Sequence, residues 1–209
     1  NFIIFIGFWP RSILPTFSQL SPNFLPTFSQ LSPLQVLGRS RFARLNSDGS
    51  LDHSFDIGTG ADLVVNAIAV QPNGRVVVVG DFAHFDGVPL HGIARLNADG
   101  SVDESFNPGS GFNDSVRLVE VQEDGRILVG GFFTEFNGVV RNRVARLMPD
   151  GSLDGSFDVG AGANGSVYSM AVQSDGKILI GGSFSTFSNL NRSGIVRLNP
   201  DGSVNTSIN

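Results

Sequence analysis

Short apolar runs alternate along this chain with polar turns rich in glycine, asparagine and aspartate, and the pattern returns at a fixed distance. Turn pairs of aspartate and glycine recur every 51 residues without insertion or deletion, at Asp48-Gly49, Asp99-Gly100, Asp150-Gly151 and Asp201-Gly202. A second series of turn glycines has the same spacing, at Gly74, Gly125 and Gly176. The pattern predicts a repeat array in which each unit buries its apolar face against its neighbours.

Both series of turns are predicted to close β-hairpins. A polar residue at the first turn position and glycine at the fourth are typical of a type I turn followed by a left-handed glycine, which gives a three-residue loop with a bulge. This loop pairs Leu45 with Leu51, and it pairs Arg44 with Asp52 on the opposite face. The same register predicts the pairs Arg95/Asp103, Arg146/Asp154, Arg197/Asn205, Val70/Val76, Val121/Ile127 and Val172/Ile178.

Each cycle of the repeat contains four short strands and no helical period. In one copy the strands read VRLVEV, RILVGG, RVARLM and SLDGSF. Four-stranded antiparallel sheets that recur every 40 to 50 residues or so are typical of β-propeller blades. The sequence therefore predicts an all-β, propeller-type array with a half blade at 41–64 and whole blades at about 65–106, 116–157 and 167–208.

This number of blades is small for a propeller, since propeller rings usually close with roughly four to eight blades that protect one another's edges. We therefore expect a partial propeller, a fragment of a longer reading frame, with further blades of the same parent chain as its partners. An open array and an oligomer are the alternatives.

The repeat spelling Arg-Leu-Asn-x-Asp-Gly-Ser-x-Asp-x-Ser-Phe, followed by Gln-x-x-Gly-[Arg/Lys]-[Ile/Val] and Gly-x-Phe-x-x-Phe, resembles the delta-60 repeat over about residues 41–209. The clearest departures are Met148 for Asn, and Asn205 and Ile208 in the last copy. The delta-60 repeat is a predicted β-propeller family. The resemblance implies a bacterial origin and an extracellular or cell-surface location within a large multidomain protein, and it implies no catalytic residues.

Composition narrows the classes of function. The chain has no cysteine, which excludes disulfides, thiolate catalysis and cysteine-ligated metal sites. Residues 41–209 contain all 19 acidic residues and 12 of the 14 basic ones, a net charge of −7. We expect no nucleic-acid partner, because a phosphate backbone is bound through an excess of basic side chains.

Residues 1–40 differ from the repeats. They contain no acidic residue, and the sequence LPTFSQLSP occurs at 14–22 and again at 25–33. We interpret this segment as low-complexity linker or as an artefact of translation or joining, and place no domain here. The opening NFIIFIGFWP also fits a truncated signal-peptide core, although it is too short to span a bilayer. Residues 31–40 alternatively fit a degraded blade.

The acidic turns are the first candidate site. Asn46, Asp48 and Asp52 place oxygen ligands around a glycine turn, as a calcium site requires. However, Arg44 stands where a calcium loop of the EF-hand type begins with an acid, and Phe55 stands where it ends with glutamate. We therefore expect turn chemistry and no cofactor, with Asp48 capping its own turn.

Recurrent phenylalanine pairs are the second candidate, since aromatic rings can stack on sugars. Residues that return in every copy are usually those that the blade needs for packing, and burial of one phenylalanine contributes about 1.5 to 3 kcal/mol. We therefore assign the pairs to the core. They are Phe82/Phe85, Phe133/Phe136 and Phe184/Phe187.

Ligand-binding residues should instead differ between copies and lie on loops. The variable segments are 86–92, 137–143, 188–194 and 107–116 with its copies. Any ligand, an unidentified protein or a glycan, is expected there. The side chains that we assign to this surface are His91, Arg141, Arg143, Asn191 and Arg192.

Catalytic chemistry has little support. His53, His84 and His91 occupy unrelated positions of the repeat, so no metal-ligand or nucleophile-base spacing emerges. Propeller enzymes often donate carboxylates from several blades to the central channel. Carboxylates available for such a role are Asp114, Glu120, Glu123 and Glu135.

An enzyme predicts carboxylates unique to one copy that converge at one loop end, and a binding module predicts clusters of such aromatic or polar residues there. Residues unique to one copy, such as Phe112, Arg117 and Tyr168, are scattered, which favours a scaffold over both. We expect a noncatalytic structural or binding module of an exported bacterial multidomain protein. The alternative is a carbohydrate-binding or carbohydrate-active propeller.

Overall fold

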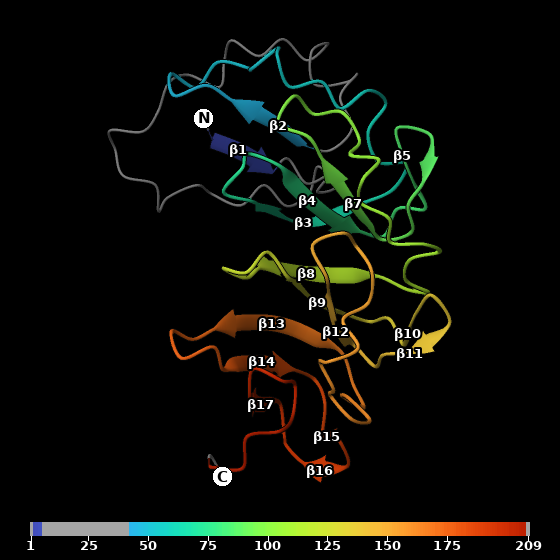
Figure 1. Cartoon of the computed structure of the whole chain (residues 1–209), viewed down its shortest axis with the longest axis vertical. Helices are drawn as coiled ribbons and strands as arrows, with labels where there is room; N and C mark the ends of the chain where they lie inside the picture. The colour runs from blue at the N-terminus through green and yellow to red at the C-terminus, as the bar shows by residue number, and fades with distance from the viewer. Residues whose placement is uncertain (1, 6–41, 208–209) are drawn as a thin grey trace, which may run out of the picture.

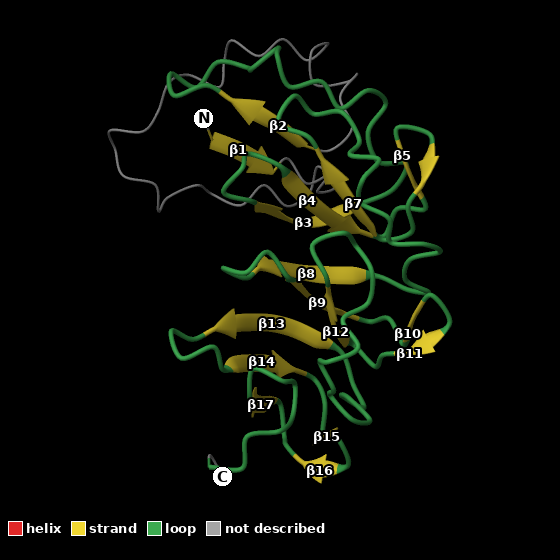
Figure 2. Cartoon of the chain, viewed as in Figure 1, coloured by secondary structure: helices red, strands yellow, loops and turns green. Residues whose placement is uncertain are grey.

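The structure is a computed structural model that describes residues 2–5 and 42–207. Within these residues the regular elements are all β-strands, as Figure 2 shows. No helix among them is long and apolar enough to cross a membrane. The predicted all-β class is confirmed.

Four main sheets follow one another along the chain and form an open series (Figure 1), which we number as blades one to four. Blade one contains β1 (Phe2–Phe5) and β2 (Phe42–Leu45). The strands of the other blades are β3 (Val65–Val70), β4 (Val76–Gly80) and β7 (Ile93–Leu96) in blade two, β8 (Val116–Val121), β9 (Ile127–Gly131) and β12 (Val144–Leu147) in blade three, and β13 (Val167–Val172), β14 (Ile178–Gly182) and β17 (Ile195–Leu198) in blade four. These three blades share one antiparallel order, with β4, β9 or β14 in the centre.

The strand register agrees with the prediction from turn chemistry. Leu45 bridges Leu51, and Nε of Arg44 donates to Oδ2 of Asp52 at 2.8 Å. Gly49 has a φ of 84°, the left-handed conformation that the bulged loop requires. The second series of turns is likewise confirmed by the pairs Val70/Val76, Val121/Ile127 and Val172/Ile178.

The fourth strand of each blade is shorter than expected. In blade three the segment SLDGSF joins the sheet only through a bridge between Leu147 and Leu153. Directly afterwards, Oδ1 of Asp154 accepts hydrogen bonds from N and Oγ of Ser156 at 2.9 and 2.6 Å. This side-chain capping folds the segment into a turn, so that blades two, three and four each consist of three strands and one bridge.

Small hairpins that the sequence pattern did not predict follow the central strands. In blade two β5 (His84–Phe85) pairs with β6 (Val88–Pro89) across Asp86 and Gly87, whose φ angles are 48° and 75°. Two positive φ angles define the type I′ turn, for which Asp-Gly and Asn-Gly are the usual sequences. The equivalent hairpins are β10 (Glu135–Phe136) with β11 (Val139–Val140) and β15 (Thr186–Phe187) with β16 (Leu190–Asn191).

The core lies between consecutive blades. Along β4, Val76 and Val78 pack into one apolar cluster while Val77 and Val79 pack into the next. Both faces of the strand are therefore buried, which explains its unbroken apolar run. The paired phenylalanines fill the same clusters and none is more than 3% exposed, which confirms their assignment to the core. They are Phe82, Phe85, Phe133, Phe136, Phe184 and Phe187.

Strand β1 takes a place in blade one that corresponds to the central strand of the other blades. Phe2 pairs with Leu45 in the antiparallel sense, as Val76 pairs with Leu96 in blade two. The structure thus adds residues 2–5 to the repeat array. The linker, artefact, signal-peptide and degraded-blade interpretations of the N-terminal segment otherwise fall on residues outside the described part.

Candidate functional site

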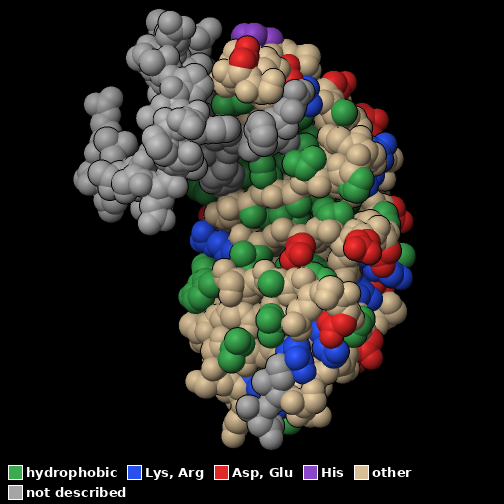
Figure 3. Space-filling model, turned by 90° about the vertical axis from the view of Figure 1, so that its left-hand side faces the viewer, with side chains coloured by type: hydrophobic (Ala, Val, Ile, Leu, Met, Phe, Trp, Pro, Cys, Tyr) green, Lys and Arg blue, Asp and Glu red, His purple; other side chains and the backbone are tan. Residues whose placement is uncertain are grey.

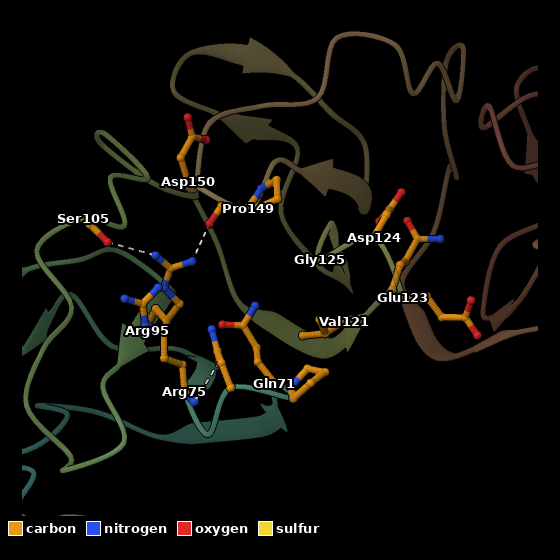
Figure 4. Close-up of a pocket in the computed structure, with 13 residues that line it drawn as sticks. Gln71, Arg75, Arg95, Ser105, Val121, Glu123, Asp124, Gly125, Pro149 and Asp150 are labelled. Atoms are coloured by element: carbon orange, nitrogen blue, oxygen red, sulfur yellow. Dashed lines mark hydrogen bonds between the residues drawn. The ribbon is translucent and has the colours of Figure 1, made fainter.

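An arginine joins each of the first three blades to the next, and it is buried in blades two and three. In blade two, Nε of Arg95 donates to Oδ2 of Asp103 at 2.7 Å, and Nη2 donates to Oγ of Ser105 at 3.2 Å. Its Nη1 donates to the main-chain oxygen of Pro149 in blade three (Figure 4). The guanidinium also lies 4.8 Å from the ring centroid of Phe106. We call this arrangement the arginine clasp.

The clasp repeats with the same atoms. Nη1 of Arg44 donates to the oxygen of Ala98, and Nη1 of Arg146 donates to the oxygen of Pro200, each at 2.6 Å. The main chain adds a neighbouring contact, in which N of Asn107 donates to the oxygen of Asp150 at 2.8 Å. The arginine hydrogen bonds are charge-assisted and therefore stronger than neutral ones, and each of these Nη1 bonds connects two blades.

The carboxylate of the clasp is ionised. Burial raises the pKa of Asp103, but the hydrogen bonds from Ser105 and Arg95 outweigh it and leave the pKa below its ordinary value. A second cation assists, because Nε of Arg75 lies 3.4 Å from Oδ2 of Asp103. The buried pair is therefore a satisfied network.

Blade four ends the described series with an incomplete clasp. Nη2 of Arg197 donates to Asn205 at 3.1 Å, but among the described residues its buried Nε has no hydrogen-bond partner. Ile195 is 62% exposed, whereas Ile93 and Val144 at the same position of blades two and three are fully buried. We call the side of blade four that carries Ile195 the open face.

A second feature is built on β-bulges at the start of the first strand in blades two, three and four. The register shifts between Val65 and Ala67, between Val116 and Leu118, and between Val167 and Ser169. The bulged residues and the residues that follow the central strand differ in every copy. We call this set the bulge strip; its members are Asn66, Asp81, Arg117, Phe132, Tyr168 and Ser183.

The polar half of the bulge strip is a hydrogen-bonded network across two blades. Nδ2 of Asn66 donates to Oδ1 of Asp81 at 2.7 Å, and Oγ of Ser115 donates to the same oxygen. Nη1 of Arg117 in blade three donates to Oδ1 of Asn66 at 3.0 Å. Nη2 of Arg117 lies 4.0 Å from Oδ2 of Asp81, which leaves a charged pair without a direct hydrogen bond.

The aromatic half continues from blade three to blade four. The guanidinium of Arg117 lies 4.7 Å from the ring centroid of Phe132, within the range of a cation–π contact. Phe132 in turn meets Tyr168 edge to face, with centroids 5.8 Å apart and planes at 86°. A hydrogen bond with Ser183 lowers the pKa of Tyr168, whose side chain is 55% exposed.

Beside the strip lies an open hollow of about 400 Å³ between blades two and three. Asp81, Arg117 and Phe132 contribute to its wall, together with His91 and Phe112. The hollow therefore joins the strip to one of the variable loops that the sequence pointed to.

The structure brings only part of the predicted ligand surface to this place. Nη1 of Arg141 donates to the oxygen of its neighbour Val140, and Arg192 does the same to Asn191, each at 2.8 Å. Arg143 extends toward blade four, where Nη1 donates to the oxygen of Ala163 at 3.0 Å. Of the assigned loop residues, only His91 lines the hollow between blades two and three.

One sequence-based interpretation is wrong. Residues unique to one copy are not scattered, because Arg117 and Tyr168 occupy the same position in consecutive blades and are joined through Phe132. Phe112 lines the adjoining hollow. The spacing of 51 residues from Asn66 to Arg117 and from Arg117 to Tyr168 was the signal in the sequence that would have grouped them.

The acidic turns are closed by their own side chains. Oδ1 of Asp48 accepts from N and Oγ of Ser50 at 2.9 and 2.6 Å, as the capping interpretation predicted. These hydrogen bonds lower the pKa of Asp48. In the part of the chain that the structure describes, no three histidine or acidic side chains gather as metal ligands. Elsewhere, Nδ1 of His84 lies 2.9 Å from Oδ2 of Asp62.

Charged side chains of both signs mix on the surface. On the face in Figure 3, acidic and basic groups lie side by side and form no extended field of one sign. Local ion pairs also occur within single turns of the chain, such as that of Lys177 with Asp175.

Comparison with known families identifies the repeat. A family model described as "Domain of unknown function (DUF5122) beta-propeller" matches residues 37–55, 71–106, 122–157 and 173–207, which make up more than half of the chain. Among curated proteins no match is found. Each of the last three matched segments contains the central strand and the third strand of one blade, namely β4 and β7, β9 and β12, and β14 and β17. The chain therefore belongs to the DUF5122 β-propeller family.

Proposed function

We propose that this chain is a noncatalytic structural repeat module, and that the open face of blade four receives a further blade of the same kind. One observation carries the proposal. The arginine clasp forms between every pair of consecutive blades in the described residues, through Arg44, Arg95 and Arg146. Within the described residues, Arg197 donates through Nη2 to Asn205 and Ser207 of its own blade, and no blade follows that could offer a main-chain oxygen to its Nη1.

The open face has the chemistry of a blade interface. Interfaces between repeats bury apolar side chains, and terminal repeats need a polar outer face to remain soluble. Ile195 instead exposes an apolar side chain at a position that is buried in blades two and three. A further blade would cover Ile195 and would offer a main-chain oxygen to Arg197.

The proposed source and location of the protein rest on the resemblance of its repeat sequence to the delta-60 repeat. It supports a place in an exported bacterial multidomain protein, at the cell surface or outside the cell. No catalytic group is part of this proposal, and the acidic turns are proposed to act without calcium because their carboxylates already accept hydrogen bonds from serine.

Duplication of one repeat tests the structural proposal. A copy of residues 157–207 is joined after residue 207, and urea unfolding followed by circular dichroism compares the extended chain with the original. Ile195→Asp is then made in both. In the original chain the side chain is 62% exposed, so the substitution should change stability by less than about 0.5 kcal/mol.

In the extended chain the same substitution should cost about 3 kcal/mol or more, because an unpaired carboxylate would be buried between blades. Val140→Asp is the matched control, because Val140 is also 62% exposed but lies on the hairpin of blade three. This substitution should change the free energy of unfolding by the same amount in both chains. Equal effects of Ile195→Asp in the two chains would refute docking of a further blade on the open face.

A further inference from the structure

We propose that the bulge strip binds a neutral oligosaccharide. This site is separate from the arginine clasp and the open face, so the proposal goes beyond the structural function and stands or falls independently of it. It is built from side chains of blades two, three and four, which lie at the end of each sheet where the first strand begins.

The first argument concerns variation between copies. Residues required for blade packing recur, as the buried phenylalanine pairs do. At the bulged position, however, the copies carry Asn66, Arg117 and Tyr168 on the same backbone geometry. A bulge redirects its side chain and is often found beside functional sites. Since packing demands none of these residues in particular, their contacts with one another indicate a surface shaped for something else.

The second argument is the chemistry of the polar half. The carboxylate of Asp81 and the guanidinium of Arg117 stand 4.0 Å apart at their nearest atoms. A hydroxyl group placed between them can donate to the carboxylate and accept from the guanidinium, with both bonds at normal length. Asn66 and Ser115 hold the other carboxylate oxygen in place, so the acceptor is fixed before the ligand arrives.

The charges around this gap select a neutral ligand. An anionic ligand would meet Asp81 and the nearby Asp114, whereas a cationic ligand would meet Arg117. A polyol satisfies both groups without leaving either charge unpaired. Sugars offer adjacent hydroxyls of this kind.

The third argument is the aromatic half. Tyr168 is 55% exposed, and the edge contact of Phe132 holds its ring. An aromatic face of this kind covers the apolar C–H face of a sugar ring, and the hydrogen bond from Ser183 to the phenolic oxygen helps to hold the ring in place. Because Phe132 contacts both Arg117 of the polar gap and Tyr168, the strip is a continuous row of side chains, which suits an oligosaccharide rather than a single sugar.

Isothermal titration calorimetry of the whole chain tests the proposal. The probes are neutral oligosaccharides of glucose, xylose, mannose, galactose and N-acetylglucosamine, with oligogalacturonate as the anionic probe and oligolysine as the cationic one. We expect at least one neutral oligosaccharide to bind more tightly than both charged probes. No binding by any neutral probe, or preferred binding of a charged one, would overturn the proposal.

Substitutions then locate the site. Tyr168→Ala and Arg117→Met should each weaken binding at least about tenfold, which is the effect of removing a central contact. Lys177→Met is the matched control, because it also removes one cation, while Nζ of Lys177 donates to Asp175 in its own turn and belongs neither to the bulge strip nor to the predicted ligand loops. Thermal melts verify that the variants are folded, and the exposed Tyr168 supplies the decisive variant should Arg117→Met unfold. Undiminished binding by Tyr168→Ala would place the sugar elsewhere.

Discussion

Arg146 in blade three donates through Nη1 to the main-chain oxygen of Pro200 in blade four, 2.6 Å away. The same guanidinium donates through Nε to Asp154 at 2.7 Å and covers the ring of Phe157 at 4.5 Å. One side chain therefore connects the outer turn of its own blade to the next blade. In an array in which each unit touches only its neighbours, such a connection contributes to the interface energy rather than to a single blade.

We expect Arg146→Ala to lower the free energy of unfolding by about 3 to 5 kcal/mol, because it leaves the buried carboxylate of Asp154 without its nearest cation. The measurement is urea denaturation followed by circular dichroism. Arg197→Ala is the matched control, since Arg197 faces the neutral Asn205 and has no described blade beyond it. Its loss should cost no more than about 1 kcal/mol. Equal losses in the two variants would show that the clasp does not couple blades.

Low pH should reduce the free energy of unfolding, because it protonates the aspartates of the arginine clasps. The folded state holds the pKa of Asp103 below the ordinary value of about 3.9, so at low pH the unfolded chain binds the proton first. The stability that this group contributes is thus complete at neutral pH and is lost as the pH falls from about 5 through the folded pKa.

Asp103→Asn should therefore be less stable at pH 7 and show a shallower decline between about pH 5 and pH 2, as measured by urea unfolding at each pH. Glu104→Gln removes an exposed neighbouring carboxylate and serves as the control. The last copy already carries Asn205 at the equivalent position, bonded to Arg197 at 3.1 Å, so the substitution should not prevent folding. A decline as steep as that of the original chain would contradict the assignment.

The fold could be predicted well because its rules are local. The type of turn at Gly49 fixes which residues face each other, so turn chemistry alone predicts the pairing of Leu45 with Leu51. The shortened fourth strand was missed because Asp154 caps the chain through its side chain, in competition with sheet pairing.

The contacts within the bulge strip could not be predicted from the pattern of apolar and polar residues along the strands. The contact of Arg117 with Asn66 crosses between blades, so it is set by how the two sheets lie against each other. The bulge between Val116 and Leu118 also interrupts simple alternation and changes where residue 117 points. Sequence spacing alone could place these residues in one column, but not in contact.

Gly100 and Gly87 should respond differently to alanine, although both have positive φ. Gly100 has a φ of 96°, and a Cβ there would lie 2.6 Å from the main-chain oxygen of Asp56 in blade one. Gly87 has a φ of 75° and nothing within 4 Å of such a Cβ. Gly87→Ala should lower the free energy of unfolding by about 1 to 2 kcal/mol through backbone strain alone. Gly100→Ala should lower it by about 1 to 3 kcal/mol more, because the new Cβ overlaps with the main chain of Asp56. Urea midpoints that show similar costs would argue against close approach of blades one and two at this turn.

Arg143 provides a last test, because it holds a left-handed φ of 66° where the other copies have Gly92 and Gly194. Both Arg143→Gly and Arg143→Ala lose the hydrogen bond to Ala163, so the difference between them reports the backbone alone. Glycine adopts this conformation without a Cβ clash, whereas alanine bears a cost of about 1 to 2 kcal/mol. We therefore expect Arg143→Gly to be the more stable variant by about 1 kcal/mol in urea unfolding, after allowance for the greater freedom of glycine in the unfolded chain. If alanine were equal to or better than glycine, the backbone at this position would not be left-handed in solution.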